Sequence, residues 1–186
     1  MLVDLSHTII DGQVTYPGLP EPRIHPHLTR ADSRSIYADG TTFAIDAITM
    51  VGNTGTYLDS PFHRYADGAD LADLQLERLV GLPASVVHLT DTRERGITSA
   101  DLVDVEIDGC AVLLHTGWNR HFGTPAYGVG APFLTAEACG FLIDGGAVLV
   151  GIDSVNIDDT ESGGARPAHT LLLGAGVGIV EHLTNL

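Results

Sequence analysis

The chain has 186 residues, which fits one domain of ordinary size with a substantial core, so we expect residues 1–186 to form a single domain. Nine arginines, no lysine and 24 acidic residues give a formal charge of -15, which repels phosphate backbones and anionic lipids and argues against nucleic-acid and membrane partners. No apolar run approaches the length of a membrane span, and the segment Met1–His7 carries an acid where a signal peptide carries positive charge, so we expect a cytoplasmic protein.

The first third of the chain is expected to combine β-structure with irregular segments. From Leu2 to about Leu28, prolines at positions 17, 20, 22 and 26 favour irregular chain. The segment from Thr41 to Met50 is rich in β-branched and aromatic residues and therefore predicts a strand.

Residues 52–63 concentrate polar groups with chemical potential. Pro61 lies between Asp59 and His63, and because proline lacks an N–H donor and pushes the preceding Ser60 to extended geometry, we predict a strand end or loop. With a period of two, one side of this extended segment carries Asn53, Gly55, Tyr57, Asp59, Pro61 and His63.

The rest of the chain predicts alternating helices and strands. A short helix is expected from Asp70 to Leu79, where leucines recur at roughly helical spacing. Apolar strands are predicted at Ala84–Leu89, Ala111–His115, Ala147–Ile152 and Val177–Val180, and helices at Ser99–Val103, Thr135–Ile143 and Pro167–Leu173. This order is typical of an α/β domain whose central strands are buried on both faces and whose ligands bind at strand ends, where Asp153 and Glu181 fall.

Several familiar motifs are excluded. The glycines at 174–178 do not have GxGxxG spacing, and the sequence contains neither a G-x-S-x-G elbow nor a P-loop, which argues against NAD binding, serine hydrolysis and nucleotide hydrolysis. Cys110 and Cys139 stand in apolar stretches and do not form a CxxC pair, so we predict free, buried thiols and a reducing compartment.

Asp59, His169 and Glu181 supply the carboxylate and imidazole donors that a catalytic divalent metal requires. His169 is expected in the helix after Arg166 and Pro167, and Glu181 at the end of the last strand. Spacing alone leaves a structural alternative open, in which His169 packs at a helix end and Glu181 is an exposed residue.

Three further side chains have both a functional and a structural reading. His63 suits a general acid or base because imidazole exchanges protons near neutral pH, and it equally suits an ordinary surface position. Trp118 is a candidate wall of a substrate pocket or a packing residue, and Arg166 is a candidate partner of a substrate carboxylate or part of a flexible loop.

The spacing of residues 53–63 resembles a known motif. Asn53-x-Gly-Thr-Tyr57-x-Asp59-x-Pro-x-His63 is similar to the HxGTHxDxPxH motif of the metal-dependent cyclase family, whose members include bacterial kynurenine formamidase. The likeness extends along nearly the whole chain, through Asp4-Leu5-Ser6-His7, Tyr16-Pro17-Gly18, the helix after Asp67-Gly68, Leu114-His115-Thr116-Gly117-Trp118, Val150-Gly151-Ile152-Asp153-Ser154 and the pair His169 and Glu181.

The resemblance implies a swivelling β/β/α domain, with central β-structure and flanking helices, that assembles as a homodimer or homotetramer. It also implies that water activated by zinc or manganese cleaves an amide of a small aromatic or cyclic substrate. By position, Asp59 corresponds to a bridging carboxylate, His169 and Glu181 to ligands of the second metal, and His63 to a proton shuttle.

Two departures from the family pattern change these expectations. Asn53 and Tyr57 replace the motif's other histidines and are poor metal ligands, so we expect one metal rather than two. Family members generally continue beyond the position of Leu186, so an edge of the domain is expected to be missing or supplied by another subunit.

The leading hypothesis is a metal-dependent hydrolase of arylformamidase type, which converts N-formylkynurenine to kynurenine and formate in tryptophan catabolism. In it, one metal held by Asp59, His169 and Glu181 activates water, His63 passes the proton to the leaving amine, and Tyr57 donates a hydrogen bond to the oxyanion. Two alternatives stay open: a cyclase or lyase that acts on a cyclic or polyketide-like substrate without the full metal site, and a non-catalytic binding protein derived from the fold.

Overall fold

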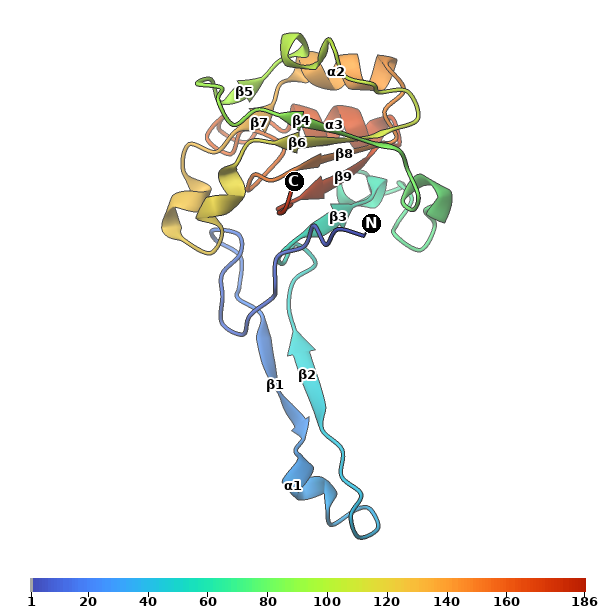
Figure 1. Ribbon diagram of the computed structural model, residues 1–186, viewed down its shortest axis with the longest axis vertical. Helices are drawn as coiled ribbons and strands as arrows, with labels where there is room; N and C mark the ends of the chain where they lie inside the picture. The colour runs from blue at the N-terminus through green and yellow to red at the C-terminus, as the bar shows by residue number, and fades with distance from the viewer. Residues whose placement is uncertain (1) are drawn as a thin grey trace. The chain divides into compact units, whose positions relative to one another are not determined.

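The computed structural model describes residues 2–186, which fall into two compact units (Figure 1). The larger unit joins the start of the chain, up to His7, to Thr56–Leu186, and the smaller unit is Thr8–Gly55. All residues that the sequence proposes for a metal site, from Tyr57 to Glu181, belong to the larger unit.

The larger unit is built on a five-stranded sheet in the order β3-β9-β8-β6-β4. Its strands are β3 (Tyr57–Asp59), β9 (Gly178–Glu181), β8 (Leu149–Ile152), β6 (Ala111–His115) and β4 (Ala84–His88). The strands β4, β6, β8 and β9 run parallel, and β3 pairs antiparallel with β9. The mixed α/β class, with central β-structure and flanking helices, confirms the predicted fold class.

Both faces of the central strands are buried, as their unbroken apolar sequences predict. Val112 and Leu114 of β6 share a core with α2 (Ala136–Asp144) and α3 (Pro167–Gly174), which lie together beside the sheet in Figure 1. Ala111 and Leu113, which point to the other face, pack in a second cluster with Leu183 and other residues near the chain ends.

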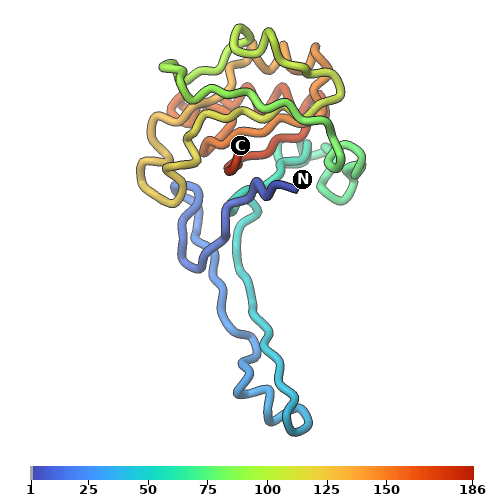
Figure 2. Tube along the Cα trace, in the orientation of Figure 1, coloured from blue at the N-terminus to red at the C-terminus, as the bar shows by residue number. Residues whose placement is uncertain are grey.

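The beginning and the end of the chain lie side by side on this second face. The amide of Thr184 donates to the carbonyl oxygen of Leu5 over 3.0 Å, and Ser6 forms an antiparallel bridge with Leu183. Figure 2 shows this as the adjacent blue and red ends of the trace. The last residues of the chain therefore cover this face of β6 and β8, where Leu183 packs against Ala111, Leu113 and Leu149.

The helix α2 begins and ends where the sequence predicts. The side chain of Thr135 accepts from the amide of Ala138 and caps the helix, and Gly145 follows its last residue. Cys139 of this helix is buried, as is Cys110, and burial raises the pKa of the Cys139 thiol to about 12.

Shorter elements complete the two units. In the larger unit β5 (Gly96–Ile97) pairs parallel with β7 (Phe133–Leu134), and 3-10 turns span Pro61–His63, Leu76–Arg78, Ser99–Leu102, Trp118–His121 and Pro125–Gly128. In the smaller unit β1 (Arg23–Leu28) pairs antiparallel with β2 (Ile45–Thr49), and the one-turn helix α1 (Arg30–Ser33) follows β1. Within residues 2–186, none of the helices combines the length and apolar character that a membrane crossing requires.

Four predicted elements were wrong in type or extent, and the first is the strand expected from Thr41 to Met50, which is confined to β2, Ile45–Thr49. The irregular segment from Leu2 to Leu28 contains β1, whose Pro26 is tolerated because the sheet has only two strands. The helix expected from Asp70 to Leu79 is reduced to a 3-10 turn, since Asp70 accepts from the amides of Ala72 and Asp73 and forms a local turn instead. The segment Ser99–Val103 is likewise a 3-10 turn, Ser99–Leu102.

The turn that carries His63 depends on a close approach of two backbone segments. A Cβ atom at position 68 would lie 2.6 Å from the carbonyl carbon of Pro61, closer than any relaxed structure permits. Gly68→Ala is therefore expected to reduce the free energy of unfolding by about 1–3 kcal/mol, measured by urea denaturation. The control is Gly140→Ala within α2, where a Cβ meets nothing within 4 Å and stability is expected to rise by about 0.5–1 kcal/mol. Equal effects of the two substitutions would contradict this account.

Candidate metal centre

The ends of three elements meet at the candidate site. In the β3–β9 ladder Tyr57 lies opposite Glu181, so the antiparallel pairing places both side chains at the carboxyl end of β9. Pro61 starts a 3-10 turn that ends at His63 and returns this imidazole to the neighbourhood of Asp59. The sequence predicted that the extended chain continues to His63 with a period of two. In the structure the strand ends at Asp59, and a 3-10 turn begins at Pro61.

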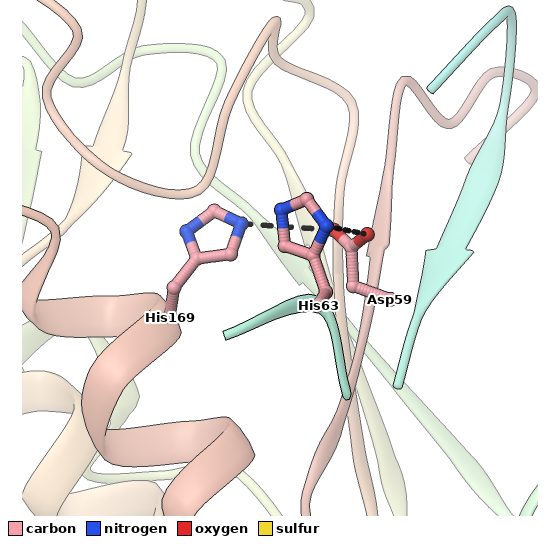
Figure 3. Close-up of side chains that lie close together, drawn as sticks. All are labelled: Asp59, His63 and His169. Atoms are coloured by element: carbon pink, nitrogen blue, oxygen red, sulfur yellow. Dashed lines mark ion pairs between the residues drawn. The ribbon is translucent and has the colours of Figure 1, made fainter. Parts of the chain in front are cut away.

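Asp59, His63 and His169 point toward one another (Figure 3). Asp59 Oδ1 lies 3.5 Å from His63 Nδ1, and Asp59 Oδ2 lies 3.6 Å from His169 Nε2. One donor atom from each residue lies within 4.8 Å of the others. Asp59 and His169 are buried, whereas the His63 side chain is 42% exposed, so the group opens to solvent on the side of His63.

Glu181 adds a second carboxylate to this group. It is fully buried, and its Oε1 lies 3.7 Å from His169 Nε2. The hydroxyl of Tyr57 donates to its Oε2, and the amide of Ile157 donates to its Oε1 over 2.6 Å. These donors hold the carboxylate with an oxygen directed at the same imidazole nitrogen that faces Asp59.

The spacing of these donors fits a single divalent cation. Two ligands at about 2.0–2.1 Å from a tetrahedral ion lie roughly 3.3–3.4 Å apart, close to the 3.6 and 3.7 Å that separate His169 Nε2 from Asp59 Oδ2 and Glu181 Oε1. Imidazole nitrogen and carboxylate oxygen are donors that zinc and manganese both accept. Asp59 and Glu181 each approach His169 Nε2, and the group whose donor atoms all lie within 4.8 Å of one another consists of Asp59, His63 and His169.

The acidic surroundings shift the pKa values of two of these residues. Burial alone lowers the pKa of His169, but hydrogen bonds to Asp158 and Asp59 and the negative charge of Glu181 outweigh it and raise this pKa to about 10. Burial raises the pKa of Glu181 to about 7, with the charge of His169 opposing and that of Asp59 adding to the shift. The carboxylates therefore favour positive charge in their midst, whether on His169 or on a cation.

Asp158 is a residue of this site that the sequence did not single out. It is buried, and its Oδ2 lies 2.6 Å from His169 Nδ1. In the sequence it belongs to the run Asp158-Asp159, which is typical of a solvated loop. The sequence does contain one indication of this role: Asp158 follows the carboxyl end of β8 by a few residues, and ligands bind near the carboxyl ends of parallel strands.

The weaker candidates hold structural contacts. Trp118 Nε1 donates to the carbonyl oxygen of Tyr127 over 2.9 Å, and its turn is fixed by the buried Asp153, which accepts from the amides of Thr116 and Gly117. Arg166 Nη1 donates to the backbone carbonyl oxygens of Asp159 and Ala165. Asn53 belongs to the smaller unit.

His182, next to Glu181, is a buried neutral histidine surrounded by the rings of Tyr57, Phe122 and Tyr127. Burial lowers its pKa from 6.5 to about 3, and a hydrogen bond to the backbone of Val155 opposes this only in part. Between these two values the unfolded chain binds a proton that the folded protein excludes. The stabilising contribution of neutral His182 is therefore complete above pH 6.5 and is lost as the pH falls below it.

This titration predicts a pH-dependent difference between the wild type and His182→Phe, a variant that keeps an aromatic ring. From pH 7 to pH 5 the stability advantage of the wild type is expected to shrink by about 2 kcal/mol, which is 1.36 kcal/mol for each pH unit below 6.5. Urea denaturation at the two pH values measures it. Curves that keep the same separation at both pH values would show that His182 does not titrate as described.

Comparison with known proteins places the chain among similar folds and sequences. The model of the Cyclase family, described as "Putative cyclase", matches residues 3–159. The kynurenine formamidase of Geobacillus thermodenitrificans is 29% identical over 182 residues, which cover 97% of this chain and 81% of the relative. The kynurenine formamidase of Bacillus cytotoxicus is 28% identical over the same shares of the two chains.

Solved structures agree with the fold. A structure described as a potential metal-dependent hydrolase with cyclase activity superimposes with a TM-score of 0.75 at 28% identity, covering 97% of this chain and 80% of the other. Isatin hydrolase A from Labrenzia aggregata gives a TM-score of 0.79 at 23% identity, covering 99% of this chain and 80% of the other, and this likeness concerns the fold alone.

Proposed function

We propose that this chain, which belongs to the cyclase family, is a metal-dependent hydrolase of arylformamidase type that cleaves a C–N amide bond of a small aromatic substrate. The observation that carries the proposal is the convergence of Asp59, His169 and Glu181 from three separate elements. The similarity to kynurenine formamidases supports N-formylkynurenine as the substrate, with kynurenine and formate as products, and hence a place in tryptophan catabolism.

Asp59, His169 and Glu181 would hold one divalent cation, either zinc or manganese. A cation in this position supplies Lewis acidity, which polarises an amide carbonyl and lowers the pKa of water. The three side chains are buried, so their charges act with little screening by solvent. Glu181 is further held by Tyr57 and Ile157, which limits how far its carboxylate can move.

His63 and Tyr57 supply the protein's own chemistry. His63 is the proton shuttle: it lies at the open side of the site, takes a proton from the attacking water and passes it to the leaving amine. The hydroxyl of Tyr57 donates to Glu181 in the resting protein. When the tetrahedral oxyanion forms, this hydroxyl donates its hydrogen bond to the oxyanion instead. Trp118 and Arg166 remain weaker proposals for substrate binding, since both already hold structural contacts.

The proposal is tested with purified protein and N-formylkynurenine. Formate release is expected to require the cation, to stop when a chelator removes it, and to return when zinc or manganese is added. Turnover that continues after complete removal of metal would contradict the hydrolase proposed here.

One observation favours a metal-independent cyclase or lyase as the second candidate. Despite its burial, contacts with Asp158 and Asp59 raise the pKa of His169, so that a protonated His169 can balance their negative charge in place of a metal, with His63 close by. Such an enzyme would retain turnover in the chelator experiment, with a cyclic substrate instead of a formamide.

We further propose that the protein works in the cytoplasm on a small molecule. Nucleic-acid and membrane partners are not expected, because the charge of -15 repels both surfaces.

We also propose a homodimer or homotetramer. In the smaller unit a two-stranded sheet cannot bury a core of its own, and it leaves Ile36, Tyr37, Phe43, Ile45, Ile48 and Met50 exposed. Sedimentation analysis would detect the assembly, and a purely monomeric protein would contradict it.

A further inference from the structure

The segment Asn156–Asp158 holds both cation-site residues that come from the last part of the chain. The amide of Ile157 donates to Glu181 Oε1 over 2.6 Å, and the side-chain amide of Asn156 lies 3.5 Å from Glu181 Oε2. Asp158 contacts His169, which belongs to a different element, α3. One short loop after β8 thus sets the positions of two side chains that are twelve residues apart in sequence.

Asp158 makes three contacts with the beginning of α3. Its Oδ1 accepts from the amide of Ala168 over 2.7 Å, and its Oδ2 accepts from the amide of His169 over 3.1 Å and from the His169 ring over 2.6 Å. Arg166, at the N-cap position, gives no side-chain cap, so Asp158 caps the helix from outside it. The carboxylate is 2% exposed, so water does not compete for these contacts.

These contacts fix the orientation of the His169 ring and the position of its proton. A carboxylate only accepts, so His169 Nδ1 is the donor to Asp158. The ring then directs Nε2 to Asp59 and Glu181, at 3.6 and 3.7 Å. The backbone amides that Asp158 holds at the same time prevent the helix end from moving away from the ring.

We propose that Asp158 is a positioning residue, which orients His169 Nε2 toward the cation so that cation affinity depends on a carboxylate outside the ligand set. A carboxylate partner of this kind also makes the imidazole a stronger donor to a metal. The inference rests on the proposed function, since it requires that a cation binds at Asp59, His169 and Glu181.

The substitution Asp158→Asn tests this role. Asparagine is a good helix cap of nearly the same size, but it has one acceptor oxygen where three donors converge, and it lacks the charge. Zinc affinity, measured by competition with a chromophoric chelator, is expected to fall about 10–100-fold. Long-range proton–nitrogen NMR spectra of the zinc-loaded proteins are expected to show the single ring proton of His169 on Nδ1 in the wild type and to show that this single arrangement is lost in the variant.

The matched control is Asp159→Asn at the next position. The Asp159 carboxylate binds Arg95 over 2.8 Å and contacts no residue of the cation site, so zinc affinity is expected to equal that of the wild type. If Asp158→Asn binds zinc as tightly as the wild type, Asp158 is not a positioning residue.

Two outcomes separate this inference from the proposed function. If Asp158→Asn does not fold, the NMR spectrum of the zinc-loaded wild type decides: a proton on His169 Nδ1 supports the inference, and a proton on Nε2 overturns it. If the wild type itself binds neither zinc nor manganese, the proposed function fails and this inference fails with it, whereas cation binding that is indifferent to Asp158 overturns the inference alone.

Discussion

Asp59→Asn is expected to abolish hydrolysis and cation binding together. Asp59 faces both His63 and His169, with one carboxylate oxygen directed at each ring (Figure 3). Since Lewis acidity contributes several kcal/mol to such a reaction, kcat/KM should fall by about 1000-fold or more. Cation affinity should fall by more than the roughly 10–100-fold that the loss of a residue outside the ligand set costs. Steady-state kinetics and metal analysis of the dialysed variant measure the two effects.

The control for Asp59→Asn is Asp104→Asn, the same change at an exposed position away from the site. Activity and metal content of this control should equal those of the wild type. An Asp59→Asn protein that keeps its metal and its activity would remove Asp59 from the site.

His63→Gln is expected to reduce kcat by about 100- to 10,000-fold while the protein keeps its cation, because a proton shuttle acts on the reaction and not on metal affinity. The geometry permits two roles for His63, a proton shuttle and a metal ligand, and the cation content of this variant distinguishes them. The His63 ring lies 3.5 Å from Asp59 and belongs to the group of potential metal donors, yet its side chain is 42% exposed, unlike the buried His169. Metal analysis beside kinetics separates the roles.

The matched control for His63→Gln is His25→Gln, an exposed histidine on β1 of the smaller unit, which should leave kcat unchanged. Loss of the cation from His63→Gln, with activity restored by excess metal, would make His63 a ligand and contradict the shuttle.

Much of the sheet was predictable because its strands are buried on both faces. A strand such as Ala111–His115 is apolar up to its last residue, and this pattern predicts a buried strand whatever its neighbours are. The helix from Asp70 to Leu79 failed for the opposite reason. Leu79 packs against the second core cluster, but Leu71 and Leu76 are exposed, so the leucines do not form one buried helix face and the Asp70 turn forms instead.

A site residue was predictable where its polar side chain differs from what the surrounding sequence requires for folding alone. Asp59 and His63 stand out around a proline, and His169 and Glu181 follow from their donor chemistry at a helix start and a strand end and from the resemblance to the family. Asp158 could not be found in this way. Its role depends on the loop turning back to α3 eleven residues later, and that path is a property of the folded chain.

The central claim is that Asp59, His169 and Glu181 hold one divalent cation. Elemental analysis of the purified, extensively dialysed protein tests it most directly, with Asp59→Asn prepared in parallel. About one equivalent of zinc or manganese per chain is expected in the wild type and almost none in the variant. A wild type without metal, or a variant with as much metal as the wild type, would contradict it.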